Sequence, residues 1–108
     1  MSDRWFKVCK REELKPGQAR SITILGRPYA VFDVDGSLHG LDAACKHMRA
    51  NLATGKLRGK VVECFMHRWT YDVTTGKCHS NEGMDTASRE VKVEDGEVWI
   101  SVHWPNET

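Results

Sequence analysis

The segment ECFMHRWTYD, residues 63–72, places a cysteine and a histidine three positions apart among large aromatic side chains. Upstream, ACKHM at residues 44–48 places a second cysteine two positions before a second histidine. Sixteen residues lie between His47 and Cys64, so the whole pattern reads C-x-H, x16, C-x-x-H. Each pair follows a strand-like stretch, and we expect both pairs on loops at one end of a sheet.

Two thiols and two imidazoles in this arrangement predict a metal site. A zinc-stabilised binding module would use the same four residues, but zinc sites usually draw like ligands from close in sequence, as C-x2-4-C and H-x3-5-H pairs. Here each loop offers one cysteine followed by one histidine. That order suits a centre of two metal ions, in which one ion takes both cysteines and the other takes both histidines.

The ligand pattern resembles that of the Rieske family, in which two cysteines and two histidines hold a [2Fe-2S] cluster. Four further segments resemble the strands and turns of Rieske-type ferredoxins, and with them the resemblance covers roughly residues 5 to 103: VDGSLHGLDAAC (34–45), GKLRGKVVEC (55–64), YDVTTGK (71–77) and VKVEDGEVWISV (91–102). The resemblance implies that Cys45 and Cys64 bind the inner iron, and that His47 and His67 bind the outer iron. Neutral imidazoles leave the cluster less negative than four thiolates would, which raises its reduction potential.

The resemblance also indicates which residues tune and shield the cluster. High-potential members carry a loop-bridging disulfide at the positions of Ala50 and Met66, so the chain resembles the disulfide-free branch. They also carry a serine that hydrogen-bonds the cluster where Trp69 stands, whereas Tyr71 keeps the family tyrosine. We therefore expect a potential near the lower end of the roughly −150 to +300 mV Rieske range. HSNEGMDTA (79–87) is expected to be the shielding third loop, although it lacks the usual proline.

Turn signals at short intervals predict an all-β fold, a Rieske-like antiparallel sandwich or barrel. The clearest hairpin is residues 91–102, where apolar residues alternate on both sides of Asp95-Gly96. Single helical turns are expected within KREELKPG (10–17) and AACKHMRANLATG (43–55). We expect one domain over residues 1–108, with a cluster-binding subdomain at about residues 44–80.

Composition excludes several classes of function. Sixteen basic and fifteen acidic residues leave a net charge of +1, so bulk charge does not favour nucleic-acid binding. The charged N-terminal segment argues against a signal peptide, and no apolar run approaches the ~20 residues that span a bilayer. We expect a soluble cytoplasmic protein, whose four cysteines point to metal or redox chemistry before disulfides.

The remaining cysteines, histidines and tryptophans have simpler interpretations. Cys9 is expected to be a small buried side chain in a strand, and Cys78-His79 lacks two further ligands that would complete a second metal site. A disulfide between Cys9 and Cys78 is not expected in the cytoplasm. His39 and His103 read as strand residues without a role, while the tryptophans of the terminal strands read as packing: Trp5, Trp99 and Trp104.

The resemblance implies an electron-transfer protein and not an enzyme: a monomeric one-electron carrier between a flavoprotein reductase and a terminal oxygenase or similar acceptor. A chain of 108 residues is too short to include the mononuclear iron domain of a Rieske oxygenase. A redox subunit or sensor bound to a larger enzyme is the alternative with the same cluster. Basic and apolar residues beside the histidines are candidates for docking an acidic partner: Lys46, Met48, Arg49, Phe65 and Arg68.

Overall fold

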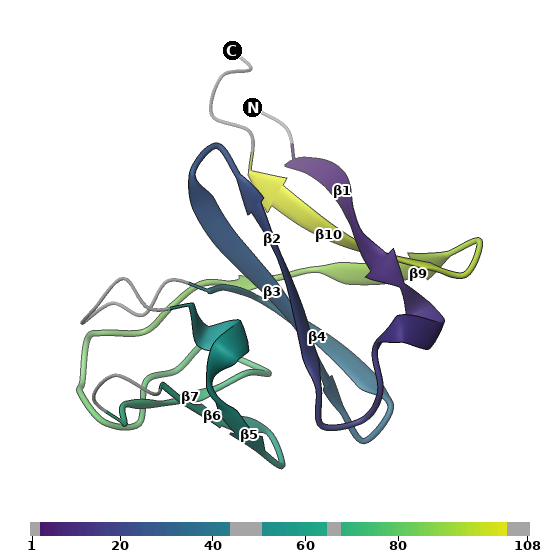
Figure 1. Cartoon of the computed structure of the whole chain (residues 1–108). Coiled ribbons are helices and arrows are strands. Elements are labelled where there is room, and N and C mark those ends of the chain that lie inside the picture. Colours follow the sequence, from purple (N-terminus) through teal and green to yellow (C-terminus); the bar gives the residue numbers. More distant parts are fainter. Residues whose placement is uncertain (1–2, 44–50, 65–67, 104–108) are drawn as a thin grey trace.

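The chain is built almost wholly from antiparallel strands, which confirms the all-β class expected from its alternating apolar residues. The structure, a computed structural model, describes residues 3–43, 51–64 and 68–103. Its strands form three sheets (Figure 1). The first has the order β1-β10-β9 and contains β1 (Asp3–Lys10), β9 (Val91–Glu94) and β10 (Glu97–His103).

The other two sheets and two short helices complete the described fold. The second sheet has the order β2-β3-β4-β8 and contains β2 (Ala19–Ile24), β3 (Arg27–Val34), β4 (Ser37–Asp42) and β8 (Ser88–Arg89). The third has the order β5-β6-β7 and contains β5 (Lys56–Arg58), β6 (Val61–Glu63) and β7 (Thr70–Asp72). The 3-10 helices η1 (Arg11–Glu13) and η2 (Leu52–Thr54) fall where single helical turns are expected. In the described part of the chain, no helix is long and apolar enough to cross a membrane.

Three hairpins turn through two residues that both have positive φ. These are Leu25-Gly26 between β2 and β3, Asp35-Gly36 between β3 and β4, and Asp95-Gly96 between β9 and β10. Positive φ at both central residues is the type I′ geometry, whose twist matches that of paired strands. The expected hairpin of residues 91–102 is confirmed, since Val93 pairs with Val98 and Val91 with Ile100.

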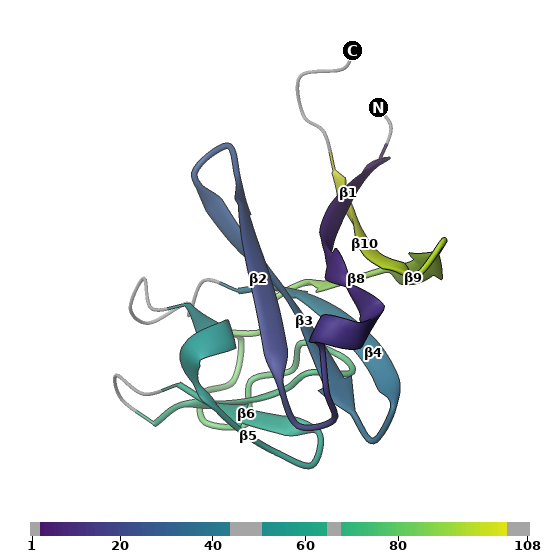
Figure 2. The same ribbon diagram turned by 45° about the vertical axis from the view of Figure 1, so that its right-hand side comes forward.

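The four-stranded sheet lies between the other two (Figures 1 and 2), and its strand β3 is buried on both faces. Ala30 and Phe32 of β3 point to one side, and Tyr29 and Val31 point to the other. On the first side lies the loop-side core, which contains Ala30, Phe32, Leu41, Ala43, Leu52, Val62, Cys64, Tyr71, Val73 and Cys78. On the second side lies the terminal core, which contains Cys9, Leu14, Tyr29, Val31, Val98, Ile100 and Val102. Burying one large apolar side chain such as Phe32 contributes about 1.5–3 kcal/mol.

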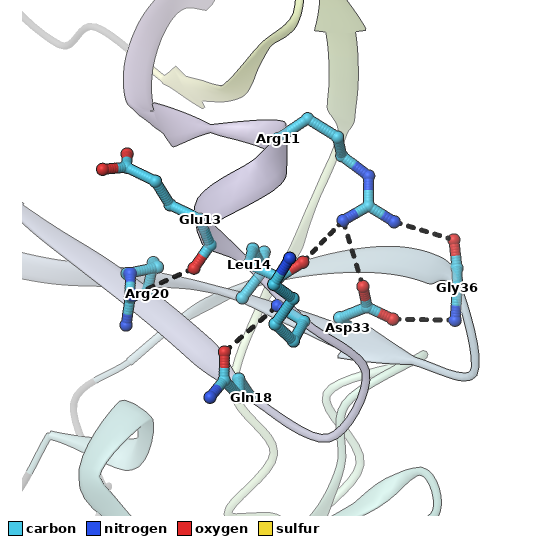
Figure 3. A network of polar contacts seen from close by, with 8 residues as sticks. Arg11, Glu13, Leu14, Gln18, Arg20, Asp33 and Gly36 are labelled. Atoms are coloured by element: carbon cyan, nitrogen blue, oxygen red, sulfur yellow. Dashed lines mark hydrogen bonds and ion pairs between the residues drawn. The ribbon is translucent and has the colours of Figure 1, made fainter.

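A polar network fixes η1 against the turn between β3 and β4 (Figure 3). The Asp33 side chain is fully buried, and its Oδ1 accepts a hydrogen bond of 2.7 Å from the Gly36 amide. Its other oxygen, Oδ2, forms no hydrogen bond but lies 3.1 Å from Nη1 of Arg11. Arg11 also donates to the carbonyl of Leu14 at 2.7 Å. A buried carboxylate is thus neutralised by one arginine, which positions the chain entering β2.

Candidate metal centre

The described residues include one of the four expected ligands, Cys64. Cys45, His47 and His67 lie outside the described ranges, as do Lys46, Met48, Arg49, Phe65 and Met66. The flanks of both loops are described, because β4 ends at Asp42 and β6 ends at Glu63. The described flanks show how the chain enters and leaves each loop.

The residues that flank the first loop on either side, Ala43 and Leu52, are hydrogen-bonded to each other. The Leu52 amide donates to the carbonyl of Ala43 at 2.6 Å, and the Ala43 amide donates to the carbonyl of Pro28 at 2.9 Å. Asn51 caps η2, since its Oδ1 accepts a hydrogen bond of 2.9 Å from the Ala53 amide. These bonds hold the residues that flank residues 44–50 at the end of strands β3 and β4.

The second loop is closed in the same way. The Cys64 amide donates to the carbonyl of Trp69 at 2.8 Å, and the Arg68 amide donates to the carbonyl of Cys64 at 2.9 Å. Arg68 adopts a left-handed φ of 60°, which turns the chain back toward β7. The Cys64 side chain is only 1% exposed, whereas Arg68 is exposed and Trp69 is half-buried.

The two loops leave different sheets, although we expected them at one end of a single sheet. The first follows β4 of the four-stranded sheet, and the second connects β6 to β7 of the small sheet. Packing joins them instead, because Ala43, Leu52 and Cys64 all belong to the loop-side core. Tyr71 lies in the same core, is fully buried and pairs with Val62 across the small sheet.

The expected third loop is held along β7, beside the second loop. The His79 amide donates to the carbonyl of Thr70 at 2.8 Å, and the Thr70 amide donates to Oγ of Ser80 at 2.9 Å. The Cys78 amide donates to Oδ1 of Asp85 at 2.8 Å, which closes the intervening turn. Met84 packs against the loop-side core. Residues 78–85 are therefore in contact with the core that contains Cys64.

An ion pair joins β4, which leads into the first loop, to β8, which follows the third segment. Arg89 donates from Nε to Oδ1 of Asp42 at 2.7 Å and from Nη2 to Oδ2 at 3.1 Å. Thr86 adds a hydrogen bond from its Oγ1 to the Asp42 carbonyl at 2.9 Å. Sequence analysis missed these positioning residues, because no local pattern relates Asp42 to a partner 47 positions away.

Two other cysteines are separate from the expected centre. Cys9 and Cys78 are buried free thiols, in the terminal core and the loop-side core respectively. Burial raises the pKa of Cys9, which keeps this thiol protonated and unreactive. Cys78 points inward and His79 is exposed, so the two side chains do not converge. Within the described ranges, no three His, Cys, Asp or Glu side chains are placed to hold a metal ion.

The described part of the site fits an iron-sulfur cluster. The thiol of Cys64 lies at the closed end of a loop and is buried in the loop-side core, which also contains Leu52 and Val62. Soft thiolate ligands of this kind are those that iron-sulfur clusters require. The flanks of the other loop, which carries Cys45 and His47 in sequence, pack in the same core.

Comparison with known proteins agrees with this assignment. Residues 4–98 match the Rieske [2Fe-2S] domain family. The ferredoxin CarAc of Metapseudomonas resinovorans is 33% identical over 103 residues, which cover 94% of this chain and 96% of that protein. A solved complex of reduced oxygenase and oxidized ferredoxin in carbazole 1,9a-dioxygenase contains a chain with 32% identity and a TM-score of 0.81, covering 90% of this chain and 92% of that one.

A longer relative matches through part of its length. Cholesterol 7-desaturase nvd of Bombyx mori is 38% identical over 105 residues. The match covers 89% of this chain but only 23% of the desaturase. The same domain therefore occurs both as most of a small protein and as a part of a large one.

Proposed function

The chain belongs to the Rieske [2Fe-2S] domain family, and from this premise we propose that it transfers single electrons from a flavoprotein reductase to a terminal oxygenase or similar acceptor. The observation that carries the proposal is the buried Cys64 at the closed end of its loop, packed in one core with the flanks of the first loop. The coverage of nearly the whole ferredoxin CarAc supports a carrier over a catalytic subunit.

Four residues would hold the cluster, which when bound accepts and releases one electron at a time. We assign Cys45 and Cys64 to the inner iron, and His47 and His67 to the outer iron. The cluster-binding subdomain would comprise residues 44–80, which include the small β5-β6-β7 sheet. The hydrogen bonds at Ala43 and Cys64 close the described ends of both loops, which supports this assignment.

Three neighbouring residues would set the potential of the cluster. Met66 stands where a disulfide cysteine would be, and Trp69 stands where a serine hydroxyl would stabilise the reduced state. Tyr71 is buried in the same core as Cys64, which supports a role beside the cysteine sulfurs. Replacing Trp69 with serine should raise the potential, and an unchanged potential in voltammetry would contradict this role.

The partner would dock where the histidine ligands reach the surface. Lys46, Met48, Arg49, Phe65 and Arg68 surround these ligands in sequence and combine positive charge with apolar area. We place the protein in the cytoplasm as a monomer. The free thiols of Cys9 and Cys78 support a reducing compartment.

Absorption and electron paramagnetic resonance spectra of the purified protein, before and after dithionite reduction, test the proposal. A red-brown protein whose reduced form gives a Rieske signal is the expected result. Cys64→Ser should abolish this signal, whereas the control Cys78→Ser removes a buried thiol outside the ligand set and should retain it. A colourless protein with stoichiometric zinc would overturn the proposal in favour of a zinc-stabilised module.

A second candidate is a redox subunit or sensor held by a larger enzyme. The desaturase match favours it, because there the same domain forms 23% of a longer chain. Size-exclusion chromatography of native extract separates the two candidates. A carrier elutes near its own 12.3 kDa, whereas a bound subunit elutes with its enzyme.

A further inference from the structure

Positive charge is concentrated in the segment that contains the two ligand loops and the chain between them. Residues 44–68 contain six of the sixteen basic residues but only one of the fifteen acidic residues, Glu63. This segment therefore carries a charge of +5 and the rest of the chain carries −4. The net charge of +1 is therefore the sum of two opposite charges, a positive one on residues 44–68 and a negative one on the rest of the chain.

Two of these basic residues lie on β5, which is an edge strand of the small sheet. Lys56 and Arg58 are exposed, while Leu57 between them is half-buried and packs against the loop-side core. Strand alternation therefore puts both basic side chains on the outer face. Within the described ranges, neither side chain forms an ion pair. Lys60, in the next turn, does form one, since its Nζ lies 3.6 Å from Oδ2 of Asp72.

The basic strand begins at the end of the sheet that carries the second ligand loop. Lys56 pairs with Glu63, which directly precedes Cys64. Arg58 lies two residues farther along β5, about 7 Å away. The Debye length is ~10 Å at 0.1 M salt. The distance from each of these charges to the second ligand loop is therefore close to one Debye length. They add to the positive charge of Arg68, which is exposed at the loop itself.

A shallow hollow of about 140 Å³ lies on this outer face. Five residues line it: Lys56, Arg58, Val61, Glu63 and Thr70. Two cations and a threonine hydroxyl outweigh the single carboxylate of Glu63, so an acidic side chain of a partner is favoured there. Lysine on an edge strand also discourages strand pairing between molecules, but that role alone needs neither the hollow nor the separation of charge.

We propose that the outer face of the β5-β6-β7 sheet extends the docking surface and receives an acidic face of the redox partner, with Lys56 and Arg58 as its main cations. The inference rests on the proposed function for the identity of the partner as a redox protein. Exposed charges at the rim of an interface act mainly on the association rate, and their effect falls as salt rises.

Electron transfer to two small oxidants of opposite charge tests the proposal without the natural partner. The reduced protein gives one electron either to hexacyanoferrate(III), a trianion, or to tris(phenanthroline)cobalt(III), a trication, in a stopped-flow experiment. The combined variant Lys56→Glu/Arg58→Glu should react about tenfold more slowly with the trianion at low salt and faster with the trication. Both differences should vanish at high ionic strength.

The single variant Lys56→Glu should change both rates in the same directions as the double variant, and Lys15→Glu is its matched control. Lys15 is exposed and lies two residues before Gly17. The Gly17 amide donates to the carbonyl of Asp33, which lies at the end of the four-stranded sheet away from the ligand loops. Lys15→Glu makes the same change of charge as Lys56→Glu, and it should leave the rates with both oxidants nearly unaltered. Equal effects of Lys56→Glu and Lys15→Glu would overturn the proposal, because they would report net charge alone.

Binding of a redox-inert anion gives a second readout that does not depend on electron transfer. Hexacyanochromate(III) should broaden the amide resonances of residues 56–60 before those of Lys15, Gly17 and Gln18, and uniform broadening would contradict the proposal. Tight binding of DNA or anionic lipid vesicles at 0.15 M salt would assign the face to a polyanion instead. A protein without the Rieske signal would refute the proposed function, whereas a loaded protein with charge-insensitive rates would refute only this inference.

Discussion

Arg89 donates two hydrogen bonds, of 2.7 Å and 3.1 Å, to the carboxylate of Asp42, which lies 47 positions earlier in the sequence. Asp42 is the last residue of β4 and directly precedes Ala43, where the first ligand loop begins. Arg89 follows the third segment and also lies over the ring of Tyr29, 5.9 Å from its centroid. One side chain therefore joins β3, β4 and β8 of the central sheet, beside the points where the first loop begins and the third segment ends.

Arg89→Gln should cost about 2 kcal/mol of unfolding free energy, because it removes a two-point, charge-assisted contact that is largely shielded from water. Urea denaturation followed by far-ultraviolet circular dichroism measures the loss. Lys7→Gln is the control, since it breaks the water-exposed ion pair with Glu97 and should shift the midpoint far less. Equal shifts for both variants would show that the Asp42 contact has no special structural role.

Gly76→Ala should cost more than about 2 kcal/mol for two separate reasons. Gly76 has a φ of +86°, and an added methyl group would overlap the carbonyl oxygen of Thr86. The Thr86 amide donates to the Gly76 carbonyl at 2.8 Å, so the two backbones cannot separate without losing this bond. Hydrogen exchange should show the loss first at residues 76–86.

Gly17→Ala is the matched control for that substitution. Gly17 has a similar φ of +84°, but no atom beyond its two chain neighbours lies within 4 Å of an added methyl group. It should therefore show only the backbone cost of about 1 kcal/mol. A loss for Gly76→Ala no greater than this would mean that the close approach to Thr86 is relaxed in solution.

The features that sequence analysis predicted correctly depend on local patterns. The β9–β10 hairpin follows from alternating valines on each side of Asp95-Gly96, which is a strong turn signal by itself. The strands before the two ligand loops are confirmed as β4 and β6. Cys9 is confirmed as a buried strand residue. Cys64 is buried, and the ligand roles of Cys45, His47, Cys64 and His67 stay predictions.

The features that sequence analysis missed depend on contacts between distant residues. The Arg11–Asp33 and Arg89–Asp42 pairs join elements 22 and 47 positions apart, and many charged residues of this chain are equivalent candidates in sequence. The origin of the two ligand loops in different sheets depends on how β5, β6 and β7 separate from the central sheet. No periodicity encodes that division, because all three sheets use the same antiparallel alternation.

Leu25→Asn should stabilise the protein by about 1 kcal/mol. Leu25 has a φ of +52° in the β2–β3 turn, a conformation that asparagine adopts at lower cost, and its side chain is 63% exposed and loses little packing. Thermal unfolding should show a higher midpoint. Leu25→Ala is the control, because it removes the same exposed side chain but keeps the strained backbone. A gain for alanine equal to that for asparagine would refute strain as the cause.

Asp72 should make stability depend on pH in the acid range. Burial raises the pKa of this carboxyl, but hydrogen bonds from the Thr74 hydroxyl and amide, together with the charge of Lys60, outweigh it and lower the pKa below the ordinary value of 3.8. The folded state thus binds this proton less readily than the unfolded state does. The carboxylate therefore contributes stability above the unfolded pKa near pH 4, and this contribution is lost as the pH falls through the lower folded value.

Asp72→Asn should remove that contribution at neutral pH and flatten the acid limb of the stability curve. A carboxyl carbon titration by nuclear magnetic resonance gives the pKa of Asp72, and urea denaturation between pH 6 and pH 3 gives the slope. Glu82→Gln removes an exposed carboxylate at a position without a positive φ and is the control for charge alone. A titration of Asp72 at or above 3.8, or parallel curves for Asp72→Asn and the wild type, would show that the Thr74 hydrogen bonds do not offset the cost of burial.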